Sequence, residues 1–381
     1  MCLTFSVVII CKNGERVIRR CLEAILFDKK ECDEIIVIDT GSDDRTINII
    51  NSIGGVNLYE YKWTDDFAAA RNFGISKASK DWIFFIDSDE VLKKGSLETL
   101  REKINEIKKY SNAEEEIVFS PKVKNTDDSI VYNAGRIIEN NDNVLFEGCI
   151  HEYPISLNSK KNLVTLKLSG VMVVHDGYEQ SVQNDKHKAE RNNRLIKAVL
   201  SEQPTNSRYY YFYYRDSKPL ISGEEFEKGM EDFFVKFPDD SYNNQVSKDL
   251  AIHYIQMQKY DKAEEHIKYL FESAKRGNTA DRSLASLLLG INEIEKIKKK
   301  QMEVLKLLEL TKENLNRYPE DSLFDQGYQF DDLIAYLLFQ LEDFEGAFSR
   351  YKDLFDKGYT EHIFRIFNKI DQLKKEQKTH L

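Results

Sequence analysis

Cysteine is scarce in this sequence, and its spacing excludes two common uses of the residue. The five cysteines are Cys2, Cys11, Cys21, Cys32 and Cys149, and none forms a Cys-x-x-Cys pair. Without such a pair or a cluster of histidines, a zinc site is not expected. An odd count that lacks the spacing of a disulfide framework indicates reduced thiols, so we expect a cytoplasmic protein.

Long apolar runs are also lacking. No run approaches the ~20 residues that a membrane-spanning helix needs. The first residues do not combine a basic region with a long apolar core, so the sequence shows no signal peptide. We therefore expect no stable membrane insertion.

Positive charge is in deficit, which bears on the partners of the protein. The 381 residues include 55 Lys and Arg against 65 Asp and Glu, a net charge of −10. Because phosphate backbones are bound by basic surfaces, this balance argues against a nucleic-acid-binding protein. The apolar and aromatic content is that of a folded protein, in a chain long enough for two domains.

The first half of the sequence alternates between strand-like and helix-like segments. Short apolar runs predict buried strands at 5–10, 34–39 and 82–87. Helical patterns lie between them at 14–26, 42–50 and 67–78, with Ser42 as the expected N-cap of the second. Such alternation predicts an α/β fold with a mainly parallel sheet covered on both faces. Further strands of an α+β extension are expected at 115–123, 144–150 and 163–175.

The second half of the sequence has helical patterns almost throughout and contains an internal repeat. Phe226 and Gly229 recur 34 residues later as Tyr260 and Ala263. Pro204 and Pro238 are separated by the same 34 residues. A helical unit of this length, with an aromatic residue three places before a small one, is typical of tetratricopeptide repeats. The alternative is an irregular helical bundle. We expect an α/β domain at 1–180 and an all-α, tetratricopeptide-like domain at 186–381.

Polar side chains follow three of the predicted strands. The residues concerned are Lys12, Asn13, Asp39, Asp87, Ser88 and Asp89. Because the carboxyl ends of parallel strands meet at one edge of a sheet, these side chains are expected to share a ligand site. Two carboxylates that flank one residue repel each other, and Mg²⁺ or Mn²⁺, completed by substrate phosphates, would relieve the repulsion. The alternative is a solvated acidic turn.

Four motifs in order resemble family 2 glycosyltransferases of the GT-A fold over about the first 180 residues. They are "SVVIICKNGERVIRRCLEAI", "DEIIVIDTGSDDRT", "DDFAAARNFGI" and "WIFFIDSDE". The later segments "FEGCIHEYP" and "VVHDGY" are similar to a branch with a C-terminal tetratricopeptide-like domain. That branch includes S-glycosyltransferases that modify glycocin peptides, which are bacteriocins glycosylated on cysteine.

The resemblance implies an inverting transfer from a nucleotide-sugar, most often a UDP-sugar. It implies that Asp39 holds the uracil or ribose and that Arg71 lines the nucleotide pocket, to which Lys12, Asn13 and Ser88 would belong. It also implies that Asp89 ligates the metal ion, that Asp87 bonds the ribose or assists the metal, and that His175 contacts the metal or the diphosphate. Without the motif, His175 would be interpreted as a core histidine and Asp39 as a helix cap.

Inverting transfer also needs a base near the acceptor. Glu152 and His151, in "IHEYP", are the candidates, and we favour Glu152 because a carboxylate is usual in the family. A thiol acceptor already carries a few per cent thiolate at neutral pH, so it makes a milder demand on the base than an alcohol does.

Three functions compete at this point. The first is transfer of a hexose, with UDP-glucose as the expected donor, to a cysteine or serine of a bacteriocin precursor peptide. The second is extension of a lipid-linked or cell-surface glycan, and the third is a non-catalytic repeat scaffold. The resemblance further implies a homodimer and gives the helical domain the role of acceptor binding or dimerisation.

Overall fold

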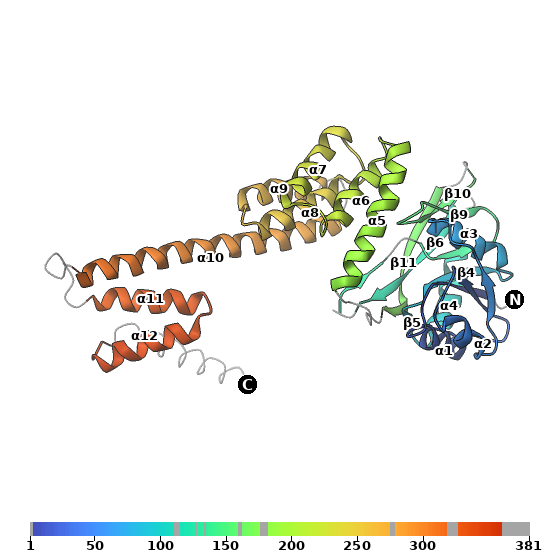
Figure 1. The fold of residues 1–381 in the computed structure, drawn as a ribbon, viewed down its shortest axis with the longest axis horizontal. Coiled ribbons are helices and arrows are strands. Elements are labelled where there is room, and N and C mark those ends of the chain that lie inside the picture. The colour runs from blue at the N-terminus through green and yellow to red at the C-terminus, as the bar shows by residue number, and fades with distance from the viewer. Residues whose placement is uncertain are drawn as a thin grey trace. The chain divides into compact units, whose positions relative to one another are not determined.

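The computed structural model describes residues 3–109, 115–125, 128–132, 135–158, 162–175, 182–274, 279–317 and 327–359. The chain divides into two compact units, Met1–Phe226 and Glu227–Leu381. The first unit contains the β-strands together with helices α1 to α6, and the described secondary-structure elements of the second are all helices (Figure 1). This arrangement confirms the expected fold class, an α/β domain followed by an all-helical region.

The first four strands form the parallel half of the large sheet. They are β1 (Phe5–Cys11), β2 (Glu34–Asp39), β3 (Asn57–Glu60) and β4 (Trp82–Asp87), in the order β3-β2-β1-β4. The apolar runs of β1, β2 and β4 are buried almost completely. Burial of both faces explains why these strands have continuous apolar runs rather than an alternation of apolar and polar residues.

The remaining strands extend the sheet in a mixed order. Strand β8 (Ile137–Glu139) is antiparallel to both β4 and β6 (Glu115–Lys124), and β11 (Asn162–His175) runs parallel to β6. At the end of the sheet, β5 (Glu90–Leu92) is antiparallel to β11. The short strand β7 (Ile130–Val131) pairs with β6. The expected extension is therefore present, and its antiparallel pairs make the complete sheet mixed.

Helices cover both faces of the sheet, and alternate residues of each central strand point to opposite faces. Val7 and Ile9 pack in one core with α1 (Ile18–Asp28), α4 (Ser96–Lys108) and Ile50. The other core contains Val8 and residues of α3. Helices α2 (Thr46–Asn51) and α3 (Phe67–Lys77) complete the layers.

A separate hairpin and two helices complete the first unit. Strands β9 (Val144–Glu147) and β10 (Tyr153–Ser156) are antiparallel and enclose a five-residue loop, 148–152. Helices α5 (Val182–Glu202) and α6 (Ser207–Ser217) pack against each other. They belong to the same unit as the sheet although they lie in the helical half of the sequence.

The second unit consists of successive helices. Its elements are α8 (Asn243–Gln256), α9 (Tyr260–Ala274), α10 (Thr279–Arg317), α11 (Tyr328–Gln340) and α12 (Phe344–Asp356), preceded by α7 (Gly223–Lys236), which crosses the boundary between the units. From α8 to α12, each helix packs against the next one in the sequence.

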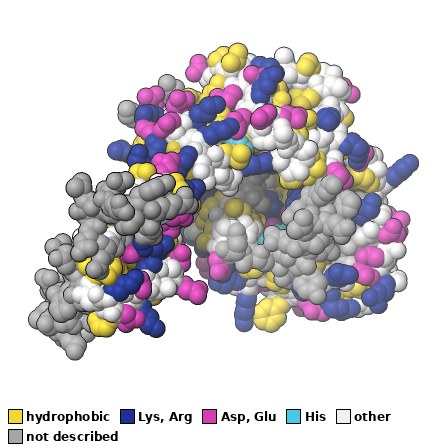
Figure 2. Space-filling model, turned by 60° about the vertical axis from the view of Figure 1, so that its left-hand side comes forward, with side chains coloured by type: hydrophobic (Ala, Val, Ile, Leu, Met, Phe, Trp, Pro, Cys, Tyr) yellow, Lys and Arg dark blue, Asp and Glu magenta, His cyan; other side chains and the backbone are white. Residues whose placement is uncertain are grey.

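The internal repeat corresponds to buried positions. Phe226 and Gly229 are buried in α7, and Tyr260 and Ala263 are buried in α9. None of the helices in the described ranges combines the length and apolar character needed to cross a bilayer. On the face drawn in Figure 2, basic and acidic side chains are interspersed rather than gathered by sign.

Candidate active site

The parallel strands bring the predicted polar residues to one edge of the sheet. In the strand register Cys11 lies opposite Asp39, and Ile10 lies opposite Asp87. The loops that follow β1 and β2 are joined by hydrogen bonds: Asn13 N donates to Ser42 Oγ at 2.8 Å, and Asp43 N donates to Asn13 Oδ1 at 2.9 Å. Ser42 is therefore a link between loops and not the predicted N-cap, a position that Arg45 occupies.

Asp39 has one carboxylate oxygen without a partner. Its Oδ2 accepts hydrogen bonds from Gly41 N at 3.0 Å and Ser42 N at 2.9 Å. Its Oδ1 is buried and has no hydrogen-bond partner in the described part of the chain. A buried polar atom of this kind is costly unless a ligand or water satisfies it. Lys12 is exposed beside the same edge.

Two buried arginines hold the carboxylate of Asp87. Arg71, from α3, places its Nη2 3.4 Å from Asp87 Oδ1, and Arg136 donates from Nη2 to Asp87 Oδ2 at 2.8 Å. Arg136 also donates from Nη1 to both carboxylate oxygens of Glu90, at 2.8 and 2.6 Å. Asp87 N donates to Glu90 Oε2 at 3.0 Å and closes the turn after β4.

These contacts set the ionisation of the acidic pair. Burial raises the pKa of Asp87, but the guanidinium groups of Arg136 and Arg71 outweigh burial and bring it below the ordinary value. The pKa of Glu90 is raised, because burial and the neighbouring Asp87 charge exceed the effect of Arg136. Burial lowers the pKa of Arg136, and the two carboxylates more than reverse that effect. Asp87 is therefore a fixed anion at the end of β4.

Asp89 and His175 meet beside this turn. His175 is the last residue of β11 and pairs in register with Glu90 of β5, which brings its Nε2 to 3.1 Å from Asp89 Oδ2. Both side chains are partly exposed, 34% for His175 and 45% for Asp89. The hydrogen bond with Asp89 raises the pKa of His175 although burial opposes the shift.

The three predicted metal-ligating residues are only partly brought together. Asp87 turns toward the arginines, whereas Asp89 and His175 face each other. In the described ranges no group of three or more histidine, cysteine or acidic side chains is arranged to hold a metal ion. A carboxylate and an imidazole suit a divalent cation that takes its remaining ligands from substrate phosphates and water.

Glu152 lies in the loop between β9 and β10 and faces α3. Its Oε1 accepts a hydrogen bond from Arg71 Nε at 2.7 Å, and its side chain is 14% exposed. The hairpin is tied to the same helix, since Asn72 exchanges hydrogen bonds with the backbone of Phe146 at 2.9 and 2.8 Å. Arg71 therefore contacts both Glu152 and Asp87.

His151 faces α6 instead. Its Nε2 lies 2.6 Å from Asp216 Oδ2, and its ring stacks on Phe212 with the centroids 4.1 Å apart. Arg208, from the same helix, donates to the His151 carbonyl.

Several residues of the site carry no sequence signal that would reveal them. Arg136 precedes a short strand outside every motif, and Asp216 follows the run "YYYFYY", in which the sequence shows only an apolar helix face. Arg136 contacts Asp87 across 49 positions of the chain, and Asp216 contacts His151 across 65. Ser88 lies in the turn itself, half-buried beside Cys11, with which it forms a hydrogen bond.

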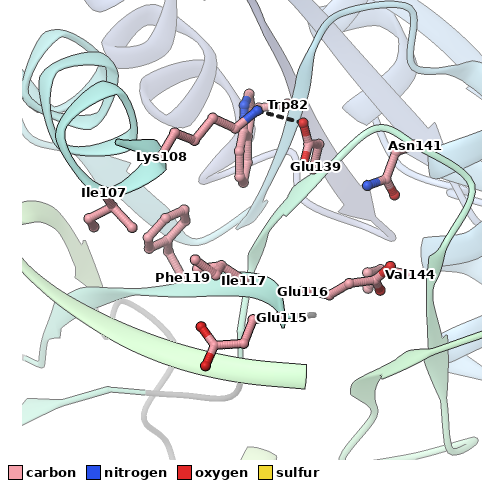
Figure 3. Close-up of a pocket in the computed structure, with 10 residues that line it drawn as sticks. All are labelled: Trp82, Ile107, Lys108, Glu115, Glu116, Ile117, Phe119, Glu139, Asn141 and Val144. Atoms are coloured by element: carbon pink, nitrogen blue, oxygen red, sulfur yellow. Dashed lines mark hydrogen bonds and ion pairs between the residues drawn. The ribbon is translucent and has the colours of Figure 1, made fainter. Parts of the chain in front are cut away.

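A cavity of about 70 Å³ lies at the opposite edge of the sheet. Trp82, the first residue of β4, lines it, and the ion pair of Lys108 with Glu139, at 2.6 Å, crosses it (Figure 3). None of the candidate residues lines it, so this cavity is separate from the candidate site.

The sequence is similar to known glycosyltransferases. Residues 6–134 match the family described as glycosyl transferase family 2. The chain is 31% identical over 226 residues to the SPbeta prophage-derived glycosyltransferase SunS of Bacillus subtilis. The aligned region covers 58% of this chain and 51% of that protein. It is 28% identical over 209 residues to a TPR repeat-containing protein of Synechococcus elongatus, and the aligned region covers 53% of this chain and 49% of that protein. The chain thus spans about half the length of these curated relatives.

Solved structures also align with the chain. The complex of S. aureus TarS residues 1–349 with UDP-GlcNAc aligns with 72% of this chain and 92% of that one, with 16% identity and a TM-score of 0.37. The family match and the similarity to SunS confirm the resemblance that the sequence motifs indicated.

Proposed function

On the premise that residues 6–134 form a domain of glycosyl transferase family 2, we propose that the protein moves a hexose from a UDP-sugar to a peptide. The acceptor is a cysteine side chain, and the transfer inverts the configuration at the anomeric carbon. The observation that carries the donor half of this proposal is Asp39. Its buried, unpartnered Oδ1 would accept a hydrogen bond from the uracil N–H or a ribose hydroxyl. Lys12, Asn13 and Ser88 line the same edge of the sheet and complete the nucleotide-sugar site.

Asp89 and His175 are the residues that would hold Mg²⁺ or Mn²⁺, because they are close together and partly exposed. A divalent cation held by these residues would supply positive charge to stabilise the leaving diphosphate. Asp87 has a different role, since Arg71 and Arg136 fix its carboxylate. We assign it to a ribose hydroxyl, for which an oriented anion is a good acceptor.

Glu152 is assigned as the base. In the transfer the acceptor sulfur bonds to the anomeric carbon, the bond from that carbon to the diphosphate oxygen breaks, and the electron pair leaves with UDP. The thiol proton passes to Glu152, whose Oε1 is oriented by Arg71. His151 is the second candidate for this step.

The peptide acceptor follows from the resemblance to glycocin S-glycosyltransferases and from the helical half of the chain. We assign donor binding to 1–180 and acceptor binding or dimerisation, as a homodimer, to 186–381. UDP-glucose is the donor we favour. Cysteines 11, 21, 32 and 149 are unpaired, which agrees with a reducing compartment, the cytoplasm.

One experiment separates the possible functions. The purified protein is incubated with UDP-glucose and with matched peptides that contain a single cysteine or serine, and the products are read by mass spectrometry. A hexose added to the cysteine peptide supports the proposal. Transfer only to a glycan or lipid-linked acceptor supports the alternative enzyme, and absence of both transfer and UDP-sugar binding supports a scaffold. Asp39→Ala serves as the control that should lose donor binding.

A further inference from the structure

The loop that carries Glu152 is held between two helices. On one side Arg71 of α3 pairs with Glu152, and Phe67 N donates to the Cys149 carbonyl at 2.9 Å. On the other side α6 contacts the loop through Tyr209, which forms a hydrogen bond with Cys149. A Cβ added at Gly148 would lie 2.9 Å from the Tyr209 hydroxyl, so the loop and α6 are in close contact.

The backbone of the loop is unusual at two positions. Gly148 has a φ of +104° and His151 has a φ of +53°. Glycine adopts such angles readily, but a residue with a Cβ does so at a cost and stays there only when its surroundings fix it. The contacts around His151 must therefore supply that constraint.

Asp216 is the centre of those contacts. Its Oδ2 lies 2.6 Å from His151 Nε2 and accepts from Asn192 Nδ2 at 2.9 Å, while Oδ1 accepts from Arg215 Nε at 2.8 Å. Burial raises the pKa of Asp216, but the hydrogen bond with His151, the charge of Arg215 and the hydrogen bond from Asn192 bring it to about 2. Its side chain is 10% exposed. It is thus an anion fixed from α5 and α6 together.

We propose that Asp216 is a positioning residue for the transfer reaction: it holds His151 in its left-handed backbone conformation, and through the adjacent peptide it keeps Glu152 on Arg71. Asn192 of α5 and Asp216 of α6 then support the loop of the proposed base. This inference rests on the proposed function, because it assumes that Glu152 acts on an acceptor.

The proposal predicts a loss of rate without a loss of donor binding. Asp216→Ala removes the acceptor for His151, and a displacement of the base by about 1 Å costs about 10²-fold in kcat. The KM for the UDP-sugar should change less than about twofold, since Asp39 and Asp89 lie on other loops. Asp216→Asn keeps one acceptor oxygen and should retain more activity than Asp216→Ala.

A matched control tests whether any contact of these helices would have the same effect. Arg194 of α5 forms an exposed ion pair with Asp65, at 2.7 and 2.9 Å, and in the described part of the chain no hydrogen bond or ion pair joins it to the loop. Arg194→Gln should leave kcat within about twofold of wild type, as expected for an exposed ion pair. Thermal unfolding of every variant is measured in parallel, and rates are compared at a temperature where all are folded.

A double-mutant cycle with His151→Ala decides the mechanism. If Asp216 acts through His151, the double variant is no slower than His151→Ala alone. Additive losses would mean that Asp216 acts independently and would overturn the proposal. The dependence of kcat on pH gives a second criterion. If Asp216→Ala only displaces Glu152, kcat falls at every pH and the shape of the profile stays the same. A shift of the acidic limb of the profile would identify His151 as the base and would overturn the positioning role of Asp216.

The outcome can be separated from failure of the proposed function. Wild-type protein that binds UDP-glucose by calorimetry and glycosylates the cysteine peptide establishes the function on its own. Undiminished kcat in Asp216→Ala against that background rejects only the positioning role. Wild-type protein that neither binds nor transfers rejects the function, and with it the proposal.

Discussion

Arg71 and Glu152 are 81 positions apart in the sequence, yet they form a buried ion pair with Nε and Oε1 2.7 Å apart. The same guanidinium extends to Asp87 and lies over the rings of Phe85 and Phe146, 5.1 and 5.4 Å from their centroids. Aromatic faces and carboxylates together fix the plane of the side chain. The donor edge of the sheet and the loop of the proposed base are therefore joined by one rigid group.

The first prediction concerns that shared arginine. Arg71→Lys keeps the positive charge but loses the planar fork that reaches two carboxylates at once. We expect kcat to fall about 10²-fold, the usual cost of losing one oriented electrostatic group. Arg19→Lys, which alters an exposed pair with Glu23, is the control and should have no measurable effect. Equal activity of the two variants would mean that Arg71 has no role in the reaction.

The second prediction concerns Asp39. Replacement by Ala removes the unpartnered oxygen and the two backbone contacts of Oδ2. A hydrogen bond to a charged group is worth about 1.5–3 kcal/mol, so the Kd for UDP should rise about tenfold to a hundredfold. Calorimetry with UDP alone measures this effect without any acceptor. An unchanged Kd would remove Asp39 from the nucleotide site.

The third prediction concerns the metal ion. Turnover should require Mg²⁺ or Mn²⁺, and Asp89→Asn should lower it ~10²-fold or more, because an anionic ligand is lost where diphosphate charge develops. The assay compares activity in EDTA with activity after the cation is restored. Full turnover in EDTA would reject the metal ion and, with it, the role of Asp89 and His175 as its ligands.

The fourth prediction concerns the acid stability of the second unit. Burial raises the pKa of Glu227, but hydrogen bonds from Lys259 and His253 bring it below the ordinary value. A group with a depressed folded pKa contributes stability above its unfolded pKa of about 4.3 and loses it as pH falls through the folded value. Glu227→Gln should therefore lower the free energy of unfolding at pH 7 by about 1–3 kcal/mol, and the difference from wild type should shrink below pH 4.

Denaturant titrations at several pH values measure that difference. Glu272→Gln, at an exposed position of α9, is the matched control and should change the free energy of unfolding by no more than about 0.5 kcal/mol. A constant difference between wild type and Glu227→Gln from pH 7 to pH 3.5 would exclude the ionised carboxylate as its source.

The sequence predicted the parallel core because its signals are local. The apolar runs of β1, β2 and β4 end in polar residues, and helical patterns lie between these strands, so strand ends and their common edge could be inferred without the structure. Ser42 was assigned wrongly as a helix cap for a related reason. A serine before a helix is a frequent N-cap, but here the loop after β1 takes its hydroxyl.

The second layer of the site could not be predicted, because it depends on contacts between distant segments. Arg136 reaches Glu90 and Asp87 across 46 and 49 positions, and Asp216 reaches His151 across 65. No periodicity or spacing marks such a pair. Only the packing of α6 against the loop after β9 brings Asp216 to its partner.

The last prediction concerns the base. Glu152→Gln keeps the size of the side chain and an oxygen that can accept from Arg71, but it removes proton acceptance. Transfer should fall by ~10² to 10⁴-fold, the usual span for general-base catalysis, while UDP-sugar affinity stays nearly unchanged. Glu147→Gln, an exposed residue at the end of β9, is the control.

The loss should depend on the nucleophile that is offered. A serine hydroxyl keeps its proton until attack, so the serine peptide should suffer most from Glu152→Gln. A cysteine thiol ionises in solution, so raising the pH toward ~8.5 should restore much of the cysteine transfer in the variant. Parallel rates on both peptides across pH, for wild type and variant, measure the difference. Equal losses on both peptides without recovery at high pH would assign Glu152 to substrate positioning through Arg71 and leave His151 as the residue to test next.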